Sequence, residues 1–330
     1  MSSALEQRSF GRTGEKVSVI GLGGAALYKH SYEQGIATVK HALDLGVSYF
    51  DTAPAYGRAS VDGRWLDRGT SQLIMGEGLD GTTKPHLLAT KLSNYSTVED
   101  CRAQIQDNLR ALRRDKVDVL LVHSIEKAKA WIPGSRDGEL LDLDREHDYA
   151  NAAIIQALRE AKAQGLCGYI GLSSNRSAAL AHVLQRVEFD MCLSAHEYSL
   201  LARQSPRTML PVVREQGIAY VVGGIFSKFG LGVATEASPF QLARRGPLAP
   251  VGAVFSDERL VELAKTTDIS IAALTVRFLI ANRELSTILV GASTPEELEE
   301  SVVAAQAGPL PPDIHQTLDK LHAETVGDAP

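Results

Sequence analysis

Short apolar runs rich in β-branched residues alternate with helical patterns along nearly the whole chain, and this alternation limits the possible folds more than any other feature. Eight runs are predicted as strands, at residues 17–22, 47–51, 87–91, 117–123, 168–173, 191–194, 218–223 and 287–291. Continuous apolar strands that are each followed by a helix are typical of a parallel sheet covered by helices. Eight such units predict an α/β fold, a (β/α)8 TIM barrel, as one domain over residues 1–330.

The ends of several predicted helices are marked in the sequence. The helical pattern at residues 36–43 stops at Gly46, and another stops at Gly217. A glycine just past the last periodic residue fits a left-handed C-terminal cap. Ser96 and Glu99 stand three residues apart before a further helical pattern, which predicts a capping box.

A doubly wound parallel sheet is the structural alternative to the barrel. It is the weaker interpretation, because the early glycine cluster at residues 21–24 does not spell GxGxxG. Two loops, at residues 127–149 and 227–256, break the regular rhythm, and each follows the end of a strand. Strand ends open onto the ligand-binding face of a barrel, so we expect both loops to shape a pocket.

The composition excludes several classes of function. With 44% hydrophobic and 22% charged residues the chain matches an ordinary globular protein, and its net charge of −6 provides no basic field for nucleic acid. We find no apolar leader and no apolar run of membrane-spanning length, so we expect a cytoplasmic protein that does not bind membranes. The three cysteines are widely scattered, which predicts reduced core thiols, no disulfide and no metal site.

Polar residues close three successive predicted strands: Asp51, Lys91 and His123. Barrel closure brings such strand ends to one rim, and Tyr56 can reach this rim from the turn after Asp51. A phenol is a poor proton donor near neutral pH unless a neighbouring cation stabilises its phenolate, and Lys91 would supply that cation. Asp51 would keep the lysine protonated, and a neutral His123 would orient a substrate carbonyl. We therefore expect Tyr56 to act as a general acid in carbonyl reduction.

These four residues match the Asp, Tyr, Lys, His tetrad of the aldo-keto reductase family, which the chain resembles from about Phe10 to Ala304. The resemblance implies a hairpin that caps the barrel bottom and a nicotinamide cofactor, NAD(H) or NADP(H), across the barrel mouth. It also implies direct hydride transfer between nicotinamide C4 and a small-molecule carbonyl, alcohol or sugar lactol. Residues 223–231 are most similar to the branch containing aldose, L-fucose and L-galactose dehydrogenases and pyridoxal dehydrogenase.

The same resemblance implies a set of cofactor-binding residues. Residues 171–175 resemble the family's G-x-S-N, in which either Ser174 or Asn175 takes the asparagine role of holding the carboxamide. Ala195 stands where a carboxamide-binding glutamine is common, and residues 223–226 replace a segment with a stacking tyrosine. The implied set is Gly23, Asp51, Ser173, Ser174, Asn175, Gly224, Phe226, Ser227, Gly230, Leu231, Gly291, Ala292, Ser293, Glu297, Glu300 and Ser301.

Glu297 bears on which cofactor is used. Family members that take NADP commonly have an arginine here, whereas a carboxylate repels the 2′-phosphate and can accept a hydrogen bond from a ribose hydroxyl. This favours NAD, with NADP as the alternative. The sequence Thr294-Pro295-Glu296-Glu297 equally predicts the first turn of a helix. In that turn Thr294 is the N-cap and Glu297 closes a capping box.

Two other functions remain open at this point. Lys91 at a strand end could be the Schiff-base nucleophile of a lyase barrel, although a neighbouring Asp51 argues against a neutral amine. A cofactor-sensing regulatory subunit is the second, because some members of the family serve as channel partners. We assign no physiological substrate, reaction direction or oligomeric state from the sequence. The hypothesis of an NAD(P)-dependent oxidoreductase is the one that uses all four rim residues.

Overall fold

A computed structural model describes residues 4–57, 59–61, 64–66, 69–93, 97–136, 138–200, 202–226 and 258–326. Eight parallel strands close a barrel in the order β10-β11-β12-β3-β4-β7-β8-β9, which confirms the predicted (β/α)8 class. The barrel strands are β3 (Ile20–Gly23), β4 (Tyr49–Asp51), β7 (Leu87–Leu92), β8 (Val117–Val122), β9 (Cys167–Ser174), β10 (Met191–Ala195), β11 (Ala219–Gly223) and β12 (Thr287–Val290).

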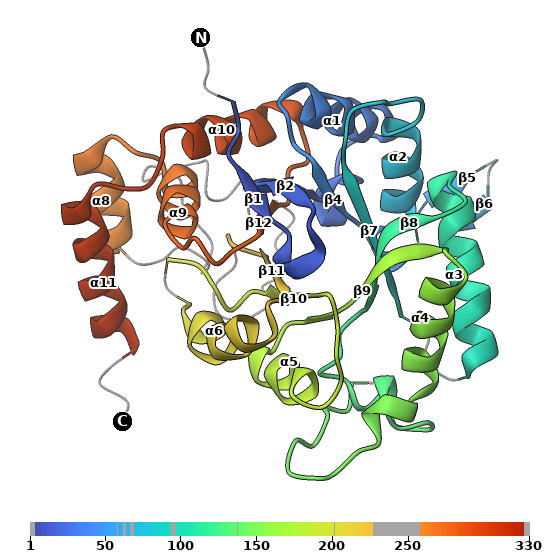
Figure 1. Ribbon diagram of the computed structural model, residues 1–330. Helices are drawn as coiled ribbons and strands as arrows, with labels where there is room; N and C mark the ends of the chain where they lie inside the picture. Colours follow the sequence, from blue (N-terminus) through green and yellow to red (C-terminus); the bar gives the residue numbers. More distant parts are fainter. Residues whose placement is uncertain are drawn as a thin grey trace.

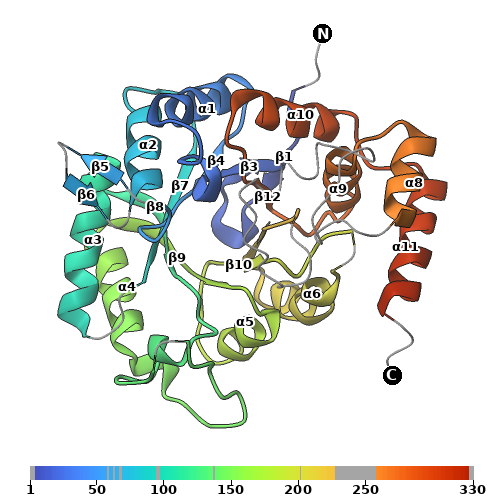
Figure 2. The same ribbon diagram turned by 180° about the vertical axis from the view of Figure 1, so that it is seen from behind.

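Helices form a ring around this barrel, as Figures 1 and 2 show from opposite sides. They are α1 (Tyr32–Asp44), α2 (Thr70–Gly78), α3 (Val98–Leu112), α4 (Ala153–Ala163), α5 (Ser177–Leu184), α6 (Gln204–Gln216), α8 (Glu258–Thr267), α9 (Ile271–Ile280), α10 (Pro295–Gln306) and α11 (Pro312–Val326). Helices α8 and α11 lie together at the outer edge, where Arg259 pairs with Glu324. None of the described helices is long and apolar enough to cross a membrane.

Apolar side chains fill both the barrel interior and the layer between strands and helices. The interior cluster includes Tyr49, Leu121, Val221 and Leu289, which point inward from four different strands. A larger cluster joins the outward-facing strand residues to the buried faces of the helices. Burial on both faces explains why the strands read as continuous apolar runs rather than as alternating patterns.

An antiparallel hairpin of β1 (Gln7–Ser9) and β2 (Lys16–Ser18) covers one end of the barrel. Phe10, in its connecting turn, is fully buried, and its ring centroid lies 5.5 Å from that of Tyr49 inside the barrel. The backbone N–H of Arg12 donates to the carbonyl of Gly217 at 2.7 Å. The hairpin therefore closes the barrel end opposite the rim formed by Asp51, Lys91 and His123.

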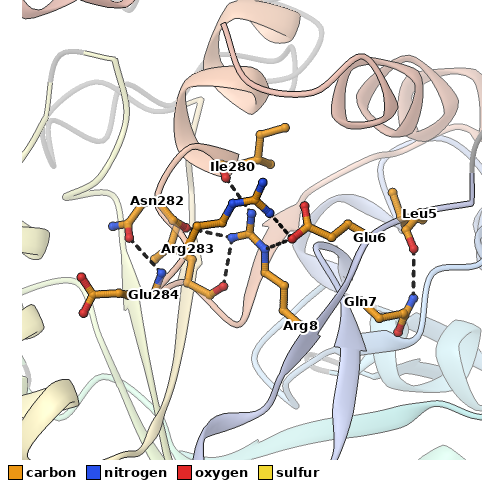
Figure 3. A network of polar contacts seen from close by, with 9 residues as sticks. Leu5, Glu6, Gln7, Arg8, Ile280, Asn282, Arg283 and Glu284 are labelled. Carbon is orange, nitrogen blue, oxygen red and sulfur yellow. Dashed lines mark hydrogen bonds and ion pairs between the residues drawn. The ribbon is translucent and has the colours of Figure 1, made fainter.

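Arg8 anchors this hairpin to the end of α9 (Figure 3). Its guanidinium is buried and donates to the carbonyl oxygens of Ile280 at 2.6 Å, Asn282 at 2.8 Å and Leu285 at 3.1 Å. The last carbonyls of a helix have no partner within the helix, and a cation that donates to them satisfies that need. Glu6 accepts hydrogen bonds from Arg8 and from the exposed Arg283.

Two local expectations are wrong, each for a physical reason. The predicted strand at residues 17–22 is two strands, because the chain changes partners at Val19: β2 pairs with β1, whereas β3 pairs with β12 and β4. The predicted cap at Ser96, which lies outside the described residues, is one residue too early. Thr97 is the N-cap of α3, and its hydroxyl accepts from the Asp100 N–H at 3.0 Å.

Two short strands lie outside the barrel before α2. Strands β5 (Ala59–Val61) and β6 (Arg64–Leu66) form an antiparallel pair before α2.

Residues 227–256, which we expected to shape the pocket, lie outside the described residues. Cys101, Cys167 and Cys192 are buried, as predicted for core residues.

Candidate active site

A cavity of about 420 Å³ opens at the carboxyl ends of the barrel strands. All four predicted tetrad residues, Asp51, Tyr56, Lys91 and His123, line it. Five glycines also line it, at positions 23, 24, 223, 224 and 291. Residues without side chains leave room at the strand ends and expose backbone groups to a ligand, as expected for the binding face of a barrel.

Lys91 and Asp51 form a buried ion pair at the base of the cavity. The side chains are 1% and 3% exposed, and Lys91 Nζ donates both to Asp51 Oδ1 and, at 2.9 Å, to the carbonyl of Thr52. Burial alone would lower the pKa of Lys91, but the charges of Asp51 and Tyr56 and its hydrogen bonds raise that pKa above the ordinary value. The lysine is therefore a protonated ammonium held in one place.

Tyr56 lies above this ammonium, with Lys91 Nζ 5.0 Å from the ring centroid. The backbone N–H of Tyr56 donates to Ala53 at 3.1 Å, and its carbonyl accepts from the N–H of Ser71 at 3.1 Å, so the turn is tied to the start of α2. Burial raises the pKa of the phenol above its ordinary value, while the charge and hydrogen bond of Lys91 oppose that rise. We expected Lys91 to lower this pKa; its effect is present, but burial outweighs it.

Gly57 lets this turn pass close to Tyr28. Its φ is +81°, a left-handed conformation, and a Cβ here would lie 2.6 Å from the Tyr28 ring. A larger residue would be strained by the backbone angle and would also clash with the ring. The glycine next to the predicted acid thus helps to place Tyr56.

His123 completes the group. Its ring stands edge-on to the Tyr56 ring at a centroid distance of 5.6 Å, and Nδ1 lies 3.1 Å from the hydroxyl oxygen of Ser93. Burial, with the charges of Lys91 and Lys127, lowers the pKa of His123 to about 3. The imidazole is neutral at physiological pH, as predicted for a residue that orients a carbonyl.

A buried amide network supports Lys91 from behind the strand. Gln72 Nε2 donates to Thr90 Oγ1 and to Asn108 Oδ1, both at 2.9 Å, and Asn108 Nδ2 donates to the backbone carbonyl of Lys91 at 2.9 Å. These contacts join α2 and α3 to β7. They fix the backbone from which the ammonium extends into the cavity.

A second polar group lies at the end of β9. The buried Glu126 accepts from Ser174 Oγ at 2.7 Å through Oε2 and from Asn175 Nδ2 at 3.0 Å through Oε1. Ser173, Ser174 and Asn175 all line the cavity. The Ser173 hydroxyl donates to the carbonyl of Val122 at 3.1 Å.

The residues present fit a nicotinamide dinucleotide. Asp51 lines the cavity, and its Oδ2 is buried with no hydrogen-bond partner within the described residues, so a bound hydroxyl donor would satisfy it. Hydroxyl and amide groups of Ser174 and Asn175 suit a carboxamide. His196 follows Ala195 and packs on Gly224: a Cβ at Gly224 would lie 2.4 Å from His196 Nδ1, so this wall is formed by His196 and not by a side chain at position 224.

Other predicted cofactor residues are distributed in three ways. Gly23, Gly224, Phe226 and Gly291 line the cavity. Ser227, Gly230 and Leu231 lie outside the described residues. The cavity lining does not include Ala292, Ser293, Glu297, Glu300 and Ser301, which follow Gly291 at the start of α10.

Glu297 is buried behind that segment. Its Oε2 accepts from both the backbone N–H and the hydroxyl of Ser293 at 2.8 Å, and its own N–H donates to Thr294 Oγ1 at 3.3 Å. Thr294 is the N-cap of α10, so this is a variant of the predicted capping box in which the glutamate accepts from the residue before the cap. The carboxylate therefore acts on the loop from inside the protein.

Several cavity residues were not predicted from the sequence: Lys29, Ser124, Leu193, His196, Ile225 and Leu289. Most lie at or just beyond the end of a barrel strand, and that position was the available signal. Of the described residues in the loop 127–149, none lines the cavity, contrary to our expectation.

The chain is similar to known proteins along most of its length. A model of the aldo/keto reductase family matches residues 19–323. The chain is 28% identical over 316 residues to the L-galactose dehydrogenase of Arabidopsis thaliana, covering 91% of this chain and 88% of that protein. It is 26% identical over 332 residues to the pyridoxal 4-dehydrogenase of Microbacterium luteolum, covering 91% and 93%.

The fold has a counterpart among solved structures. The holo form of an aldo-keto reductase from Bacillus halodurans superposes with a TM-score of 0.71 at 22% identity, covering 96% of each chain. At this identity the likeness shows the fold, and the family match carries the assignment of function. The chain therefore belongs to the aldo/keto reductase family and is an NAD(P)-dependent oxidoreductase.

Proposed function

We propose that this protein interconverts a small aldehyde, ketone or sugar lactol and its reduced or oxidised partner, with Tyr56 as the general acid and base. The observation that carries the proposal is that the Tyr56 ring lies beside both the Lys91 ammonium, 5.0 Å from its centroid, and a neutral His123, at a centroid distance of 5.6 Å. Names of relatives support sugar or pyridoxal-like substrates as the first to be tried.

A bound nicotinamide supplies or accepts a hydride at C4. In the reductive direction the protein's own part is to bind the substrate oxygen and to deliver a proton to it. His123 is neutral and can donate one N–H to that oxygen, which holds the carbonyl without charge repulsion from Lys91. Tyr56 then gives its proton, and Lys91 stabilises the phenolate that remains.

In the oxidative direction the same residues work in reverse. The Tyr56 phenolate accepts the proton of the alcohol or lactol hydroxyl, and Lys91 holds the population of phenolate higher than burial alone would allow. Asp51 keeps the lysine charged in both directions. In both directions these residues transfer one proton between the Tyr56 hydroxyl and the substrate oxygen.

The residues at the nicotinamide end are proposed as Gly23, Asp51, Ser173, Ser174, Asn175, Gly224 and Phe226, with Gly291 at the start of the nucleotide segment. For Ser227, Gly230, Leu231, Ala292, Ser293, Glu300 and Ser301 the proposal rests on the family resemblance. We propose NAD over NADP, because Glu297 places a buried negative charge behind the segment that resembles the family's adenosine site. A 2′-phosphate would be repelled by it.

The Schiff-base alternative is disfavoured by the ion pair. An amine nucleophile must be neutral, whereas the pKa of Lys91 is raised and its Nζ already donates to Asp51 and Thr52. Borohydride reduction in the presence of a carbonyl substrate distinguishes the two. A covalent adduct on Lys91 would support the lyase.

The direct test follows the absorbance of the reduced nicotinamide with a panel of aldehydes, ketones, sugars and alcohols, in both directions and with both cofactors. We expect turnover with at least one carbonyl and alcohol pair, and its loss in Tyr56→Phe. Cofactor binding without turnover on the whole panel would favour the regulatory subunit and contradict the proposal.

A further inference from the structure

We propose that Glu126 is a positioning residue that orients Asn175 at the nicotinamide end of the cavity. The inference rests on the proposed function, because it assumes that a nicotinamide carboxamide binds beside Ser174 and Asn175. Glu126 itself is 5% exposed and does not line the cavity. It touches the residues that do.

The contact with Glu126 sets the direction of the Asn175 amide. A carboxylate only accepts hydrogen bonds, so the oxygen that faces Asn175 requires the Nδ2 group on that side, and the 3.0 Å contact has this arrangement. The amide oxygen of Asn175 is consequently turned away from Glu126. Asn175 is exposed and lines the cavity, so this oxygen is presented to a ligand that can donate an N–H, as a carboxamide can.

Ser174 is bound to the same carboxylate. Its hydroxyl donates to Glu126 Oε2 at 2.7 Å and accepts from the backbone N–H of Arg176 at 3.0 Å. The proton of this hydroxyl is therefore committed to the carboxylate. Of the two residues that the sequence left as alternatives for the asparagine role, Asn175 keeps a strong acceptor for the carboxamide, and Ser174 helps to hold Glu126.

Backbone contacts on both sides hold Glu126 in place. Ser124 has φ +59°, so the chain turns back immediately after His123, and the Ile125 N–H donates to the carbonyl of Ser173 at 3.0 Å. The Glu126 carbonyl accepts from the Leu141 N–H at 2.8 Å, and Trp131 Nε1 donates to the carbonyl of Ile125 at 2.8 Å. The loop at residues 127–149 thus supports the pocket from behind through Glu126.

His196 is a further neighbour of this carboxylate. Burial lowers the pKa of His196, and the charges of Glu126 and Glu197 oppose that decrease. His196 packs on Gly224 across the cavity wall from β9. Glu126 therefore lies behind the part of the cavity wall where Ala195 replaces the glutamine that is common in the family. It positions the polar side chains of Ser174 and Asn175 in that wall.

The test compares binding of two ligands in the absence of turnover. Isothermal titration would measure the dissociation constants of NADH or NADPH, whichever the wild type binds more tightly, and of ADP-ribose or its 2′-phosphate, which lack the nicotinamide. In Glu126→Gln the new side chain carries an N–H donor as well as an oxygen, so it no longer requires the Asn175 Nδ2 group on its side and no longer fixes the direction of that amide. We therefore expect the dinucleotide to bind roughly tenfold more weakly, the scale of one lost hydrogen bond. The fragment should bind within about twofold of wild type.

Two further variants separate positioning from a general structural role. In an Asn175→Ala background, Glu126→Gln should have no additional effect on dinucleotide binding, because its action passes through Asn175. Glu139→Gln is the matched control, since Glu139 belongs to the same loop, its side chain is 44% exposed and, among the described residues, it accepts within that loop, from the Arg136 N–H at 3.1 Å. It should bind both ligands like the wild type.

Several results would overturn the proposal. Equal weakening of the dinucleotide and the fragment would give Glu126 a merely structural role, and unchanged binding of both would give it none. If Glu126→Gln does not fold, Glu126→Asp, which keeps the charge but is one methylene shorter, must show the same selective loss. A wild type that binds neither dinucleotide would contradict the proposed function as well, whereas selective binding failures in the variants concern Glu126 alone.

Discussion

The ammonium of Lys91 lies 5.0 Å from the centre of the Tyr56 ring while it is fixed by Asp51 and by the carbonyl of Thr52. A cation in this place stabilises the phenolate form of the tyrosine, and the buried phenol needs that stabilisation because burial alone raises its pKa. The acidity of the phenol therefore depends on Lys91, which is 40 residues from its carboxylate partner Asp51 in the sequence.

The first prediction removes the cation together with its partner, so that no unpaired carboxylate is left buried. In the double variant Lys91→Met, Asp51→Asn we expect the ascending limb of the pH profile for alcohol oxidation to move to higher pH, because the Tyr56 phenolate that accepts the proton loses its stabilising charge. Asp51→Asn alone removes the carboxylate that keeps Lys91 charged, so it should shift the limb in the same direction but by less than the double variant. A profile in the double variant that coincides with wild type would contradict the role of Lys91.

The second prediction concerns stability at low pH. The pKa of His123 is about 3 in the folded protein and about 6.5 in an unfolded chain. Between these values the unfolded chain binds a proton at His123 that the folded chain does not, so the folded state loses stability as pH falls through this window, and the effect is absent above about pH 6.5.

Denaturant unfolding of wild type and His123→Gln at pH 7 and pH 4 measures this contribution. The wild type should lose more of its unfolding free energy between the two values than the variant, by roughly 2–4 kcal/mol on the scale of a shift of this kind. Equal losses would mean that the pKa of His123 is not lowered in the folded protein.

The third prediction concerns the anchor of the hairpin. Arg8→Met removes three hydrogen bonds from a buried cation to the carbonyls of Ile280, Asn282 and Leu285, and we expect a loss of about 3 kcal/mol in the free energy of unfolding. Arg283→Met is the matched control, because Arg283 also pairs with Glu6 but its side chain is 63% exposed. The control should change stability by less than about 1 kcal/mol.

The fourth prediction concerns cofactor choice. Glu297→Gln keeps an oxygen that can accept from Ser293 but removes the buried charge, so the ratio of kcat/KM with NAD to kcat/KM with NADP should fall several-fold. Glu299→Gln removes a charge from the same helix on the side facing His41 and should leave the ratio unchanged. An unchanged ratio in Glu297→Gln would leave this glutamate a capping role only.

The barrel could be predicted because burial on both faces makes every strand a continuous apolar run. Local connectivity could not be read in the same way: the run at residues 17–22 hides a change of pairing partner at Val19, since both strands bury their side chains. Likewise Ser96 and Thr97 are equally good N-caps by composition. Only the position of the first turn of α3 selects Thr97.

The tetrad was predictable because parallel strands in register bring residues at their carboxyl ends to one rim. Glu126 and His196 were not, because each depends on a residue other than glycine with positive φ, at Ser124 (+59°) and at His196 itself (+67°). No sequence pattern marks such turns. The buried role of Glu297 also depends on a contact with Ser293 that spacing alone leaves open.

The central claim is that Tyr56 transfers the proton, and the most direct measurement is kcat together with the cofactor dissociation constant of Tyr56→Phe. The phenylalanine keeps the ring beside Lys91 and His123 and removes only the hydroxyl. We predict that kcat falls by roughly 10² or more, the scale of general acid catalysis, while the cofactor dissociation constant stays within about twofold of wild type. Wild-type kcat in this variant would contradict the account.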